Sequence, residues 1–169
     1  MTEILNPPTG FLHPFSIRTA SAADCPSLIP LINAAFSIET FLEGTRTDES
    51  RLTAMMEKGT ILVAEDSSAR LLGCVYVEVG GDRGYMGQLA VDRAHQRAGL
   101  GRILVEAAES HLRKSGCKAV DIVVLSLRPE LPPVYRRIGY LETGTGPFTP
   151  QRSLAPGVEC HGIFMSKQF

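Results

Sequence analysis

The sequence predicts an α/β (α+β) fold in a single domain, with a mixed β-sheet that carries helices on both faces. The 169 residues suffice for one hydrophobic core. Segments that alternate like strands and segments with helical spacing follow one another along the chain. Residues 101–115 are the clearest helix, because their apolar residues fall on one stripe and Gly116 follows a basic last turn.

The expected elements follow in a definite order. We expect about seven strands, at residues 15–20, 60–65, 71–79, 85–91, 119–125, 140–145 and 158–166. Helices are expected at residues 21–36, 48–58, 101–115 and 132–139. Pro30 predicts a kink in the first helix or a late start. Pro and Gly interrupt residues 1–14, so we expect a flexible N-terminal arm there and a single domain over residues 15–169.

The composition is that of an ordinary soluble globular protein. Net charge is −1 and no apolar run approaches the roughly 20 residues of a membrane span, so neither a nucleic acid nor a membrane is an expected partner. The cysteines lack the spacing of a metal site and are interpreted as reduced, buried thiols, so no metal is expected. The N-terminus lacks a secretory signal pattern, which favours the cytoplasm.

Residues 91–102 have the features of a phosphate-binding loop. They follow a predicted strand and lead into the helix at 101–115, where unpaired backbone N–H groups and the helix dipole attract an anion. Gly99 and Gly101 let a ligand approach the backbone closely. The G-x-x-x-x-G-K-[ST] and G-x-G-x-x-G patterns of nucleotide and dinucleotide sites are absent. Positive charge comes from Arg93, Arg97 and Arg102.

Two motifs carry a resemblance to a known family. The pattern Gln96-x-x-Gly99-x-Gly101 resembles the Q/R-x-x-G-x-G/A signature of the GNAT superfamily of N-acetyltransferases. Tyr135-x-x-x-Gly139-Tyr140 is similar to a later motif of the same superfamily, at a typical distance from the first. The resemblance extends over about residues 15–166 and implies a GNAT-like fold whose sheet splays beside the strand at 85–91.

The resemblance implies an acetyl-CoA-dependent N-acetyltransferase. The acetyl group of acetyl-CoA would pass to a primary amine by direct attack on the thioester in a ternary complex. Backbone amides of residues 97–102 would hold the pyrophosphate, and the strand backbone would pair with the pantetheine arm. The implied cofactor-binding residues are Leu89, Ala90, Val91, Gln96, Arg97, Ala98, Gly99, Leu100, Gly101, Arg102 and Tyr135. Residues 127–132 lack the Asn that often contacts pantetheine in this family.

Two side chains are candidates for catalysis. Tyr135 matches the family's usual donor to the departing thiolate, although a core tyrosine bonded elsewhere is the alternative. The strand at 85–91 contains no carboxylate, so Glu78 is the candidate base, acting through a water. The alternative for Glu78 is a solvated glutamate at a strand end. His161 lies among apolar residues of the last strand and either lines the acceptor pocket or is structural.

The identity of the acceptor stays open between a small-molecule amine and a peptide. Loops at 36–47 and 144–157 are expected to recognise it. Acidic residues in and after the first loop favour a cationic amine or are simply solvated, namely Glu39, Glu43, Asp48 and Glu49. A coenzyme A-binding module without turnover is the alternative function. Homodimers are common in the family. The last strand is expected to be exposed, so a homodimer in which it pairs across a two-fold axis is compatible with the sequence.

Overall fold

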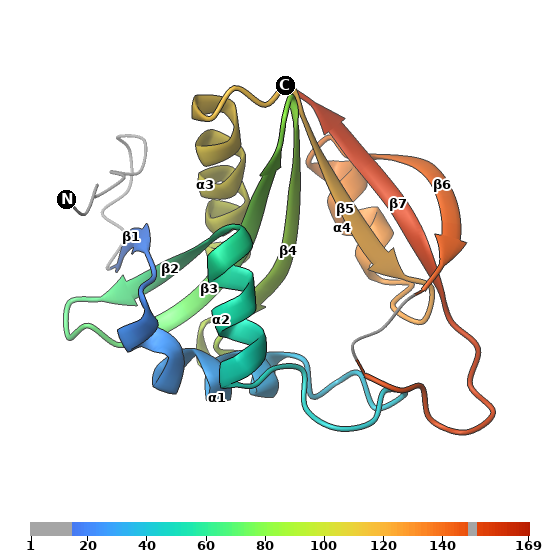
Figure 1. Ribbon diagram of the computed structural model, residues 1–169, viewed down its shortest axis with the longest axis horizontal. Helices are drawn as coiled ribbons and strands as arrows, with labels where there is room; N and C mark the ends of the chain where they lie inside the picture. Colours follow the sequence, from blue (N-terminus) through green and yellow to red (C-terminus); the bar gives the residue numbers. More distant parts are fainter. Residues whose placement is uncertain (1–14, 149–151) are drawn as a thin grey trace.

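A seven-stranded sheet organises the molecule (Figure 1). The computed structural model describes residues 15–148 and 152–169, so the expected arm at residues 1–14 lies outside the described residues. The strand order is β1-β2-β3-β4-β5-β7-β6, and every neighbouring pair is antiparallel except β4 and β5. The predicted mixed sheet is therefore confirmed. The strands are β1 (Phe15–Thr19), β2 (Thr60–Asp66), β3 (Leu71–Gly80), β4 (Arg83–Val91), β5 (Ala119–Leu125), β6 (Leu141–Pro147) and β7 (His161–Gln168).

Helices cover both faces of this sheet, as predicted. Those of the described residues are α1 (Cys25–Ala35), α2 (Glu49–Lys58), α3 (Leu100–Lys114) and α4 (Leu131–Arg137). On one face, α3 buries Leu104 and Leu112 among strand residues such as Val75, and α4 packs at the edge of the same cluster. On the other face, α1 and α2 bury Leu28 and Leu52. None of the described helices combines the length and the apolar character needed to cross a bilayer.

Some element boundaries differ from the predicted ones for local reasons. The first helix starts at Cys25, after a 3-10 turn over Ala22–Asp24, and a proline stands in its first turn. Pro30 lies inside this helix, so it does not set the start of the helix. β6 continues to Pro147 through residues expected to be a loop, because it pairs with β7 as far as His161. Cross-strand pairing thus overrides the local signal of glycine and proline.

The parallel strands β4 and β5 separate along their length. They pair only at the three positions Arg83↔Ala119, Gly84↔Val120 and Tyr85↔Asp121. Figure 1 shows the two strands close together at one end and apart at the other. The splay inferred from the family resemblance is therefore present, and it opens the middle of the sheet.

A β-bulge lies in β4 where the splay begins. Cys74 pairs with Ala90 and Tyr76 with Gly87, so the single residue between them on β3 opposes two residues of β4. One of these two, Gln88, has a left-handed φ of 52°. In a bulge the extra residue leaves the hydrogen-bond ladder, so its backbone groups become free for other partners.

Candidate functional site

The loop between β4 and α3 forms an exposed cradle of backbone amides. The Gln96 side chain closes the loop by donating from Nε2 to the carbonyl oxygen of Val91 at 3.1 Å. Arg97 and Gly99 both adopt left-handed backbone conformations, with φ of 64° and 85°. Gly99 is the N-cap of α3, and a Cβ at this position would meet no atom within 4 Å. Residues 97–99 are exposed and lead directly into the positive end of a 15-residue helix, whose first residue, Leu100, is buried.

The arginines of this loop differ in whether they already have a partner. Arg97 is exposed and has no hydrogen bond or ion pair with any residue in the described part of the chain. Arg102 pairs with Glu106 at 3.0 Å, one turn along α3. Arg93 donates to Ser37 Oγ at 2.6 Å. Arg97 is thus the arginine of the loop that is most available to an anion.

The splay leaves a cavity of about 440 Å³ between β4 and β5. We call it the splay cavity. Gln88 and Leu89 of β4 line one side, Val123 and Leu125 of β5 line the other, and Tyr135 of α4 reaches it from the neighbouring helix. The bulged segment of β4 therefore borders a space between two strands, which is where an extended ligand could add to the sheet edge.

Tyr135 is one of the residues that line this cavity. Its ring packs edge-on against Tyr140, with ring centroids 5.5 Å apart. The hydroxyl has no hydrogen-bond partner among residues 15–148 and 152–169, whereas the hydroxyl of Tyr140 donates to Glu109 at 2.9 Å. Burial raises the pKa of Tyr135 to about 12, so its hydroxyl stays protonated at neutral pH. The ring is anchored as in a core tyrosine, but the hydroxyl is available as a donor.

A second cavity, of about 470 Å³, lies beside the first on the α2 side of the sheet. We call it the α2 cavity. Arg46, Tyr85, Gly87, Gln88 and Phe148 line both cavities, so the two adjoin at the bulge.

Glu78 lines the α2 cavity. The residue is half-buried near the end of β3, so it is not a fully solvated glutamate. Its Oε2 accepts a hydrogen bond from the Tyr76 hydroxyl at 2.8 Å. Burial, and then this hydrogen bond, raise the pKa of Tyr76, so the tyrosine remains a donor to the carboxylate. Glu78 is thus a carboxylate held by a hydrogen bond, and it lies opposite Tyr85, one of the residues that line both cavities.

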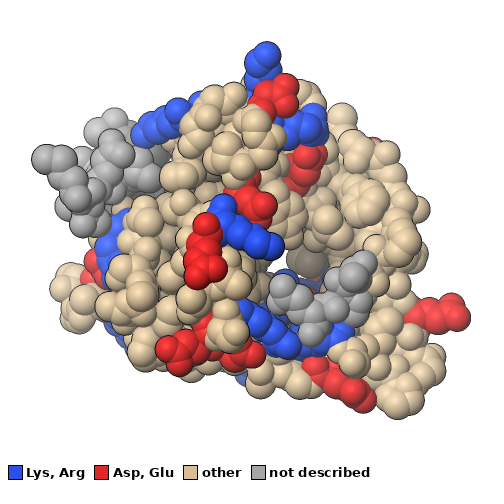
Figure 2. Space-filling view, viewed as in Figure 1, with Lys and Arg blue, Asp and Glu red and all other residues tan. Residues whose placement is uncertain are grey.

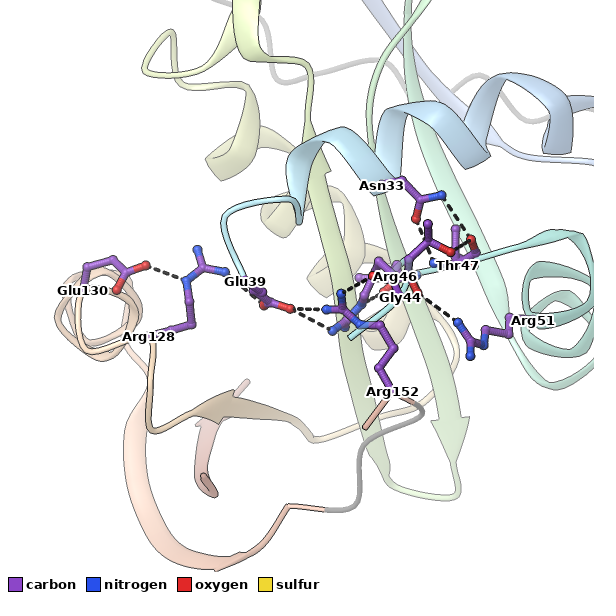
Figure 3. A network of polar contacts seen from close by, with 11 residues as sticks. Asn33, Glu39, Gly44, Arg46, Thr47, Arg51, Arg128, Glu130 and Arg152 are labelled. Carbon is purple, nitrogen blue, oxygen red and sulfur yellow. Dashed lines mark hydrogen bonds and ion pairs between the residues drawn. The ribbon is translucent and has the colours of Figure 1, made fainter. Parts of the chain in front are cut away.

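One buried carboxylate joins three loops around the site (Figure 3). Glu39, in the segment after α1, is only 4% exposed. Its Oε1 accepts from Arg128 at 3.0 Å, and its Oε2 accepts from Arg152 at 2.7 Å and lies 3.5 Å from Arg46. These arginines come from the segment between α1 and α2, the β5–α4 loop and the β6–β7 connection. The ion-pair cluster therefore connects the loops expected to contact the acceptor.

Of the two alternatives for the acidic residues, a site for a cationic amine or solvated charges, neither describes Glu39. Glu39 is buried and neutralised, and Asp48 caps α2 by accepting from the Arg51 amide at 2.9 Å. The charged side chains that face the α2 cavity are mainly basic. His161 is exposed at the start of β7 and lines neither cavity.

Several residues of the site carried no signal in the sequence. Arg46, Arg128 and Arg152 are far apart along the chain, and only the fold brings them to one carboxylate. Gln88 is a polar residue in a left-handed conformation that sequence patterns assign to glycine. In the described part of the chain, no group of three or more His, Cys, Asp or Glu side chains could hold a metal ion.

Comparison with known proteins identifies the family. The family model described as Acetyltransferase (GNAT) family matches residues 27–140, which is more than half of the chain. The chain therefore belongs to this acetyltransferase family, and the resemblance carried by its two motifs is confirmed.

Two curated relatives match part of the chain. The mycothiol acetyltransferase of Propionibacterium freudenreichii is 28% identical over 141 residues, covering 76% of this chain and 45% of that protein. A rice protein named "Probable glucosamine 6-phosphate N-acetyltransferase 2" is 35% identical over 103 residues, covering 55% of this chain and 60% of that protein. The chain thus spans only about half of the length of these relatives.

Solved structures share the fold over nearly the whole chain. The ribosomal-protein-S18-alanine N-acetyltransferase of Escherichia coli superposes with a TM-score of 0.73 at 18% identity, covering 91% of this chain and 93% of that one. A phosphinothricin acetyltransferase of Sinorhizobium meliloti, solved in complex with acetyl-CoA, gives a TM-score of 0.72 at 16% identity, covering 93% and 89%. At these identities the likeness establishes the fold.

Proposed function

We propose that the chain is an N-acetyltransferase that moves an acetyl group from acetyl-CoA to a primary amine. One observation carries the proposal. The end of β4 connects an anion cradle at residues 97–102, a bulge that frees backbone groups, and a cavity lined by Tyr135, whose hydroxyl has no partner among the described residues. A long ligand with a pyrophosphate at one end and a reactive thioester at the other fits this succession of features.

The cosubstrate is held along β4 in this proposal. The amides of residues 97–102 bind the pyrophosphate, with Arg97 adding charge. The pantetheine arm lies in the splay cavity against the backbone of Leu89, Ala90 and Val91. The thioester then reaches the bulge at Gln88, where the two cavities adjoin.

The acceptor enters from the α2 cavity and attacks the thioester carbonyl carbon. Glu78 takes a proton from the amine through a water, so the nitrogen lone pair becomes available. The new C–N bond forms as the carbonyl oxygen gains negative charge, which the N–H near Leu89 stabilises. The C–S bond then breaks, and the Tyr135 hydroxyl donates a hydrogen bond to the departing thiolate. The positively charged nitrogen gives up its second proton to water as the amide forms, and the thiolate takes a proton from solvent. A cavity of about 470 Å³ suits a small-molecule amine.

The Tyr135→Phe variant tests the catalytic proposal. We expect kcat to fall by about tenfold to a hundredfold, because the thiolate loses its donor. The Kd of acetyl-CoA should change by less than about twofold, because the cradle and the ring packing are kept. Thiol release under saturating acetyl-CoA measures kcat, and calorimetry measures Kd.

Two outcomes of this experiment would contradict the proposal. An unchanged kcat would remove Tyr135 from the mechanism. A wild-type protein that binds acetyl-CoA but acetylates no amine in a broad panel would instead support a coenzyme A-binding module without turnover.

The pH dependence of turnover gives a second test. Burial raises the pKa of Tyr135 to about 12, so the donor form persists below that pH and is lost only above it. We expect kcat/KM to rise with pH as the amine, with an ordinary pKa of about 10.4, loses its proton, and to show no falling limb before about pH 10.5. A falling limb near pH 8 to 9 that disappears in Tyr135→Phe would contradict the assignment.

A further inference from the structure

The α2 cavity carries an excess of positive charge. Among the described residues that line it, four side chains are cationic and one, Glu78, is anionic. The excess is local, because the whole chain has a net charge of −1. Figure 2 shows Lys and Arg side chains at the floor of a hollow on this face of the molecule. The cationic side chains are Arg46, Arg51, Lys58 and Arg152.

The buried ion-pair cluster does not neutralise this charge. Glu39 is shared by three guanidinium groups, and Glu130 adds a second carboxylate only to Arg128. Two carboxylates therefore face three arginines. Arg46 has the longest contact with Glu39, at 3.5 Å, while Arg152 is held at 2.7 Å. The cluster leaves Arg46 as its least satisfied cation.

Arg46 is fixed in position although it is incompletely paired. Its Nε donates to the Gln88 side chain at 2.8 Å, and its guanidinium lies 4.3 Å from the centre of the Phe36 ring. In the described part of the chain no acceptor binds its second terminal nitrogen. Desolvation by burial lowers the pKa of Arg46, which indicates that its charge is poorly compensated. A fixed guanidinium with a free N–H is a preorganised site for an oxyanion.

Helix α2 adds two more cations on one face. Arg51 and Lys58 are separated by two helical turns and line the same cavity. Lys58 is exposed and has no ion pair within residues 15–148 and 152–169. Arg51 lies 3.7 Å from Asp48 and donates to the Thr45 carbonyl oxygen at 3.0 Å. The ammonium of Lys58 is thus free to approach a bound anion.

We propose that the α2 cavity binds the anionic group of an amine acceptor, a carboxylate or a phosphate, between Arg46 and the α2 cations. This inference rests on the proposed function and names the class of its substrate. Glu78, the one acidic side chain among the described residues that line this cavity, lies opposite Tyr85 in the pairing of β3 with β4. The acceptor therefore binds with its anion toward the arginines and its ammonium toward Glu78 and the thioester. An amine with additional positive charge is disfavoured by repulsion.

The test compares pairs of amines in which one member carries an anionic group and its partner is a neutral analogue. Wild-type protein is titrated by calorimetry with 2-aminoethyl phosphate against ethanolamine, and with β-alanine against 3-aminopropanamide. We expect the anionic member of at least one pair to bind at least about tenfold more tightly than its neutral partner. A preference seen only with 2-aminoethyl phosphate identifies the anion as a phosphate, and one seen only with β-alanine identifies it as a carboxylate. The preference should weaken as ionic strength rises.

Variants locate the site. Lys58→Gln should reduce the preference about threefold or more without disturbing the buried cluster, because Lys58 is exposed. Arg46→Gln should reduce it further, and Arg46→Lys should restore part of it. Lys114→Gln removes the same charge at the far end of α3 and should change nothing.

The outcomes separate this inference from the proposed function. Equal binding of both members of each pair, or binding of neither, overturns the anionic acceptor. So does a preference that persists in both Lys58→Gln and Arg46→Gln. If the protein nevertheless binds acetyl-CoA and acetylates neutral amines, the proposed function stands. If acetyl-CoA does not bind, the proposed function fails, and the amine pairs still report whether the cavity selects an anion.

Discussion

Gly99→Glu should raise the Kd of acetyl-CoA by at least about a hundredfold, because it places a carboxylate where we propose that the pyrophosphate binds. Gly99 has a φ of 85°, and a Cβ added at this residue would have no atom within 4 Å, so the new side chain would occupy the space of the ligand rather than that of the protein. A residue other than glycine is also strained in this left-handed conformation, and relief of the strain would shift the backbone of the loop. Calorimetric titration of acetyl-CoA into wild type and variant measures the loss.

Two controls separate charge from backbone strain. Gly81 has a φ of 73°, also has open space around a Cβ, and lies in the turn before β4, away from the cradle. Gly81→Glu should therefore keep wild-type affinity. Gly99→Ala introduces strain without charge and should lose less than about tenfold. Wild-type affinity in a folded Gly99→Glu would mean that the pyrophosphate binds elsewhere.

Glu39→Gln should lower the free energy of unfolding by about 3–5 kcal/mol, because it leaves buried guanidinium groups without their carboxylate. Glutamine has nearly the same shape, so the loss reports charge rather than packing. The arginines of three loops meet at this carboxylate. If the variant lets these loops move apart, the KM of the acceptor should also rise, because the loops are expected to contact the acceptor. Urea unfolding curves measure the first effect and steady-state kinetics the second.

Glu130→Gln is the matched control for this variant. Its carboxylate pairs with the same Arg128 at 2.6 Å, but its side chain is 54% exposed. An exposed pair contributes at most about 1 kcal/mol, so this variant should unfold close to the wild-type midpoint. Equal, small losses in Glu39→Gln and Glu130→Gln would show that the buried cluster does not hold the loops together.

Periodicity predicted most of the fold. Most strands and helices have spacings that a sequence displays directly, because they bury one or both faces in the core. β6 is an exception, since nearly all of its residues are exposed. The glycine-containing loop between β4 and α3 was also predictable, since glycines after a strand and before a strong helix have a local physical meaning. β6 was predicted too short because its last residues, up to Pro147, depend on pairing with β7.

The charges of the candidate site could not be predicted in the same way. Glu39 stands in a segment with other acidic residues, which suggested an acidic surface, yet three distant arginines bury and neutralise it. The bulge at Gln88 is another example, because a polar residue in a left-handed conformation leaves no periodic signal. Both features depend on which loops meet in space, and sequence patterns describe only neighbours along the chain.

A crystal structure of the protein with acetyl-CoA tests the central claim most directly. The account predicts pyrophosphate oxygens about 3 Å from the amides of residues 97–102, with the arm between β4 and β5 and the sulfur beside the Tyr135 hydroxyl. Coenzyme A bound outside the splay cavity, or with its pyrophosphate away from this loop, would contradict the account.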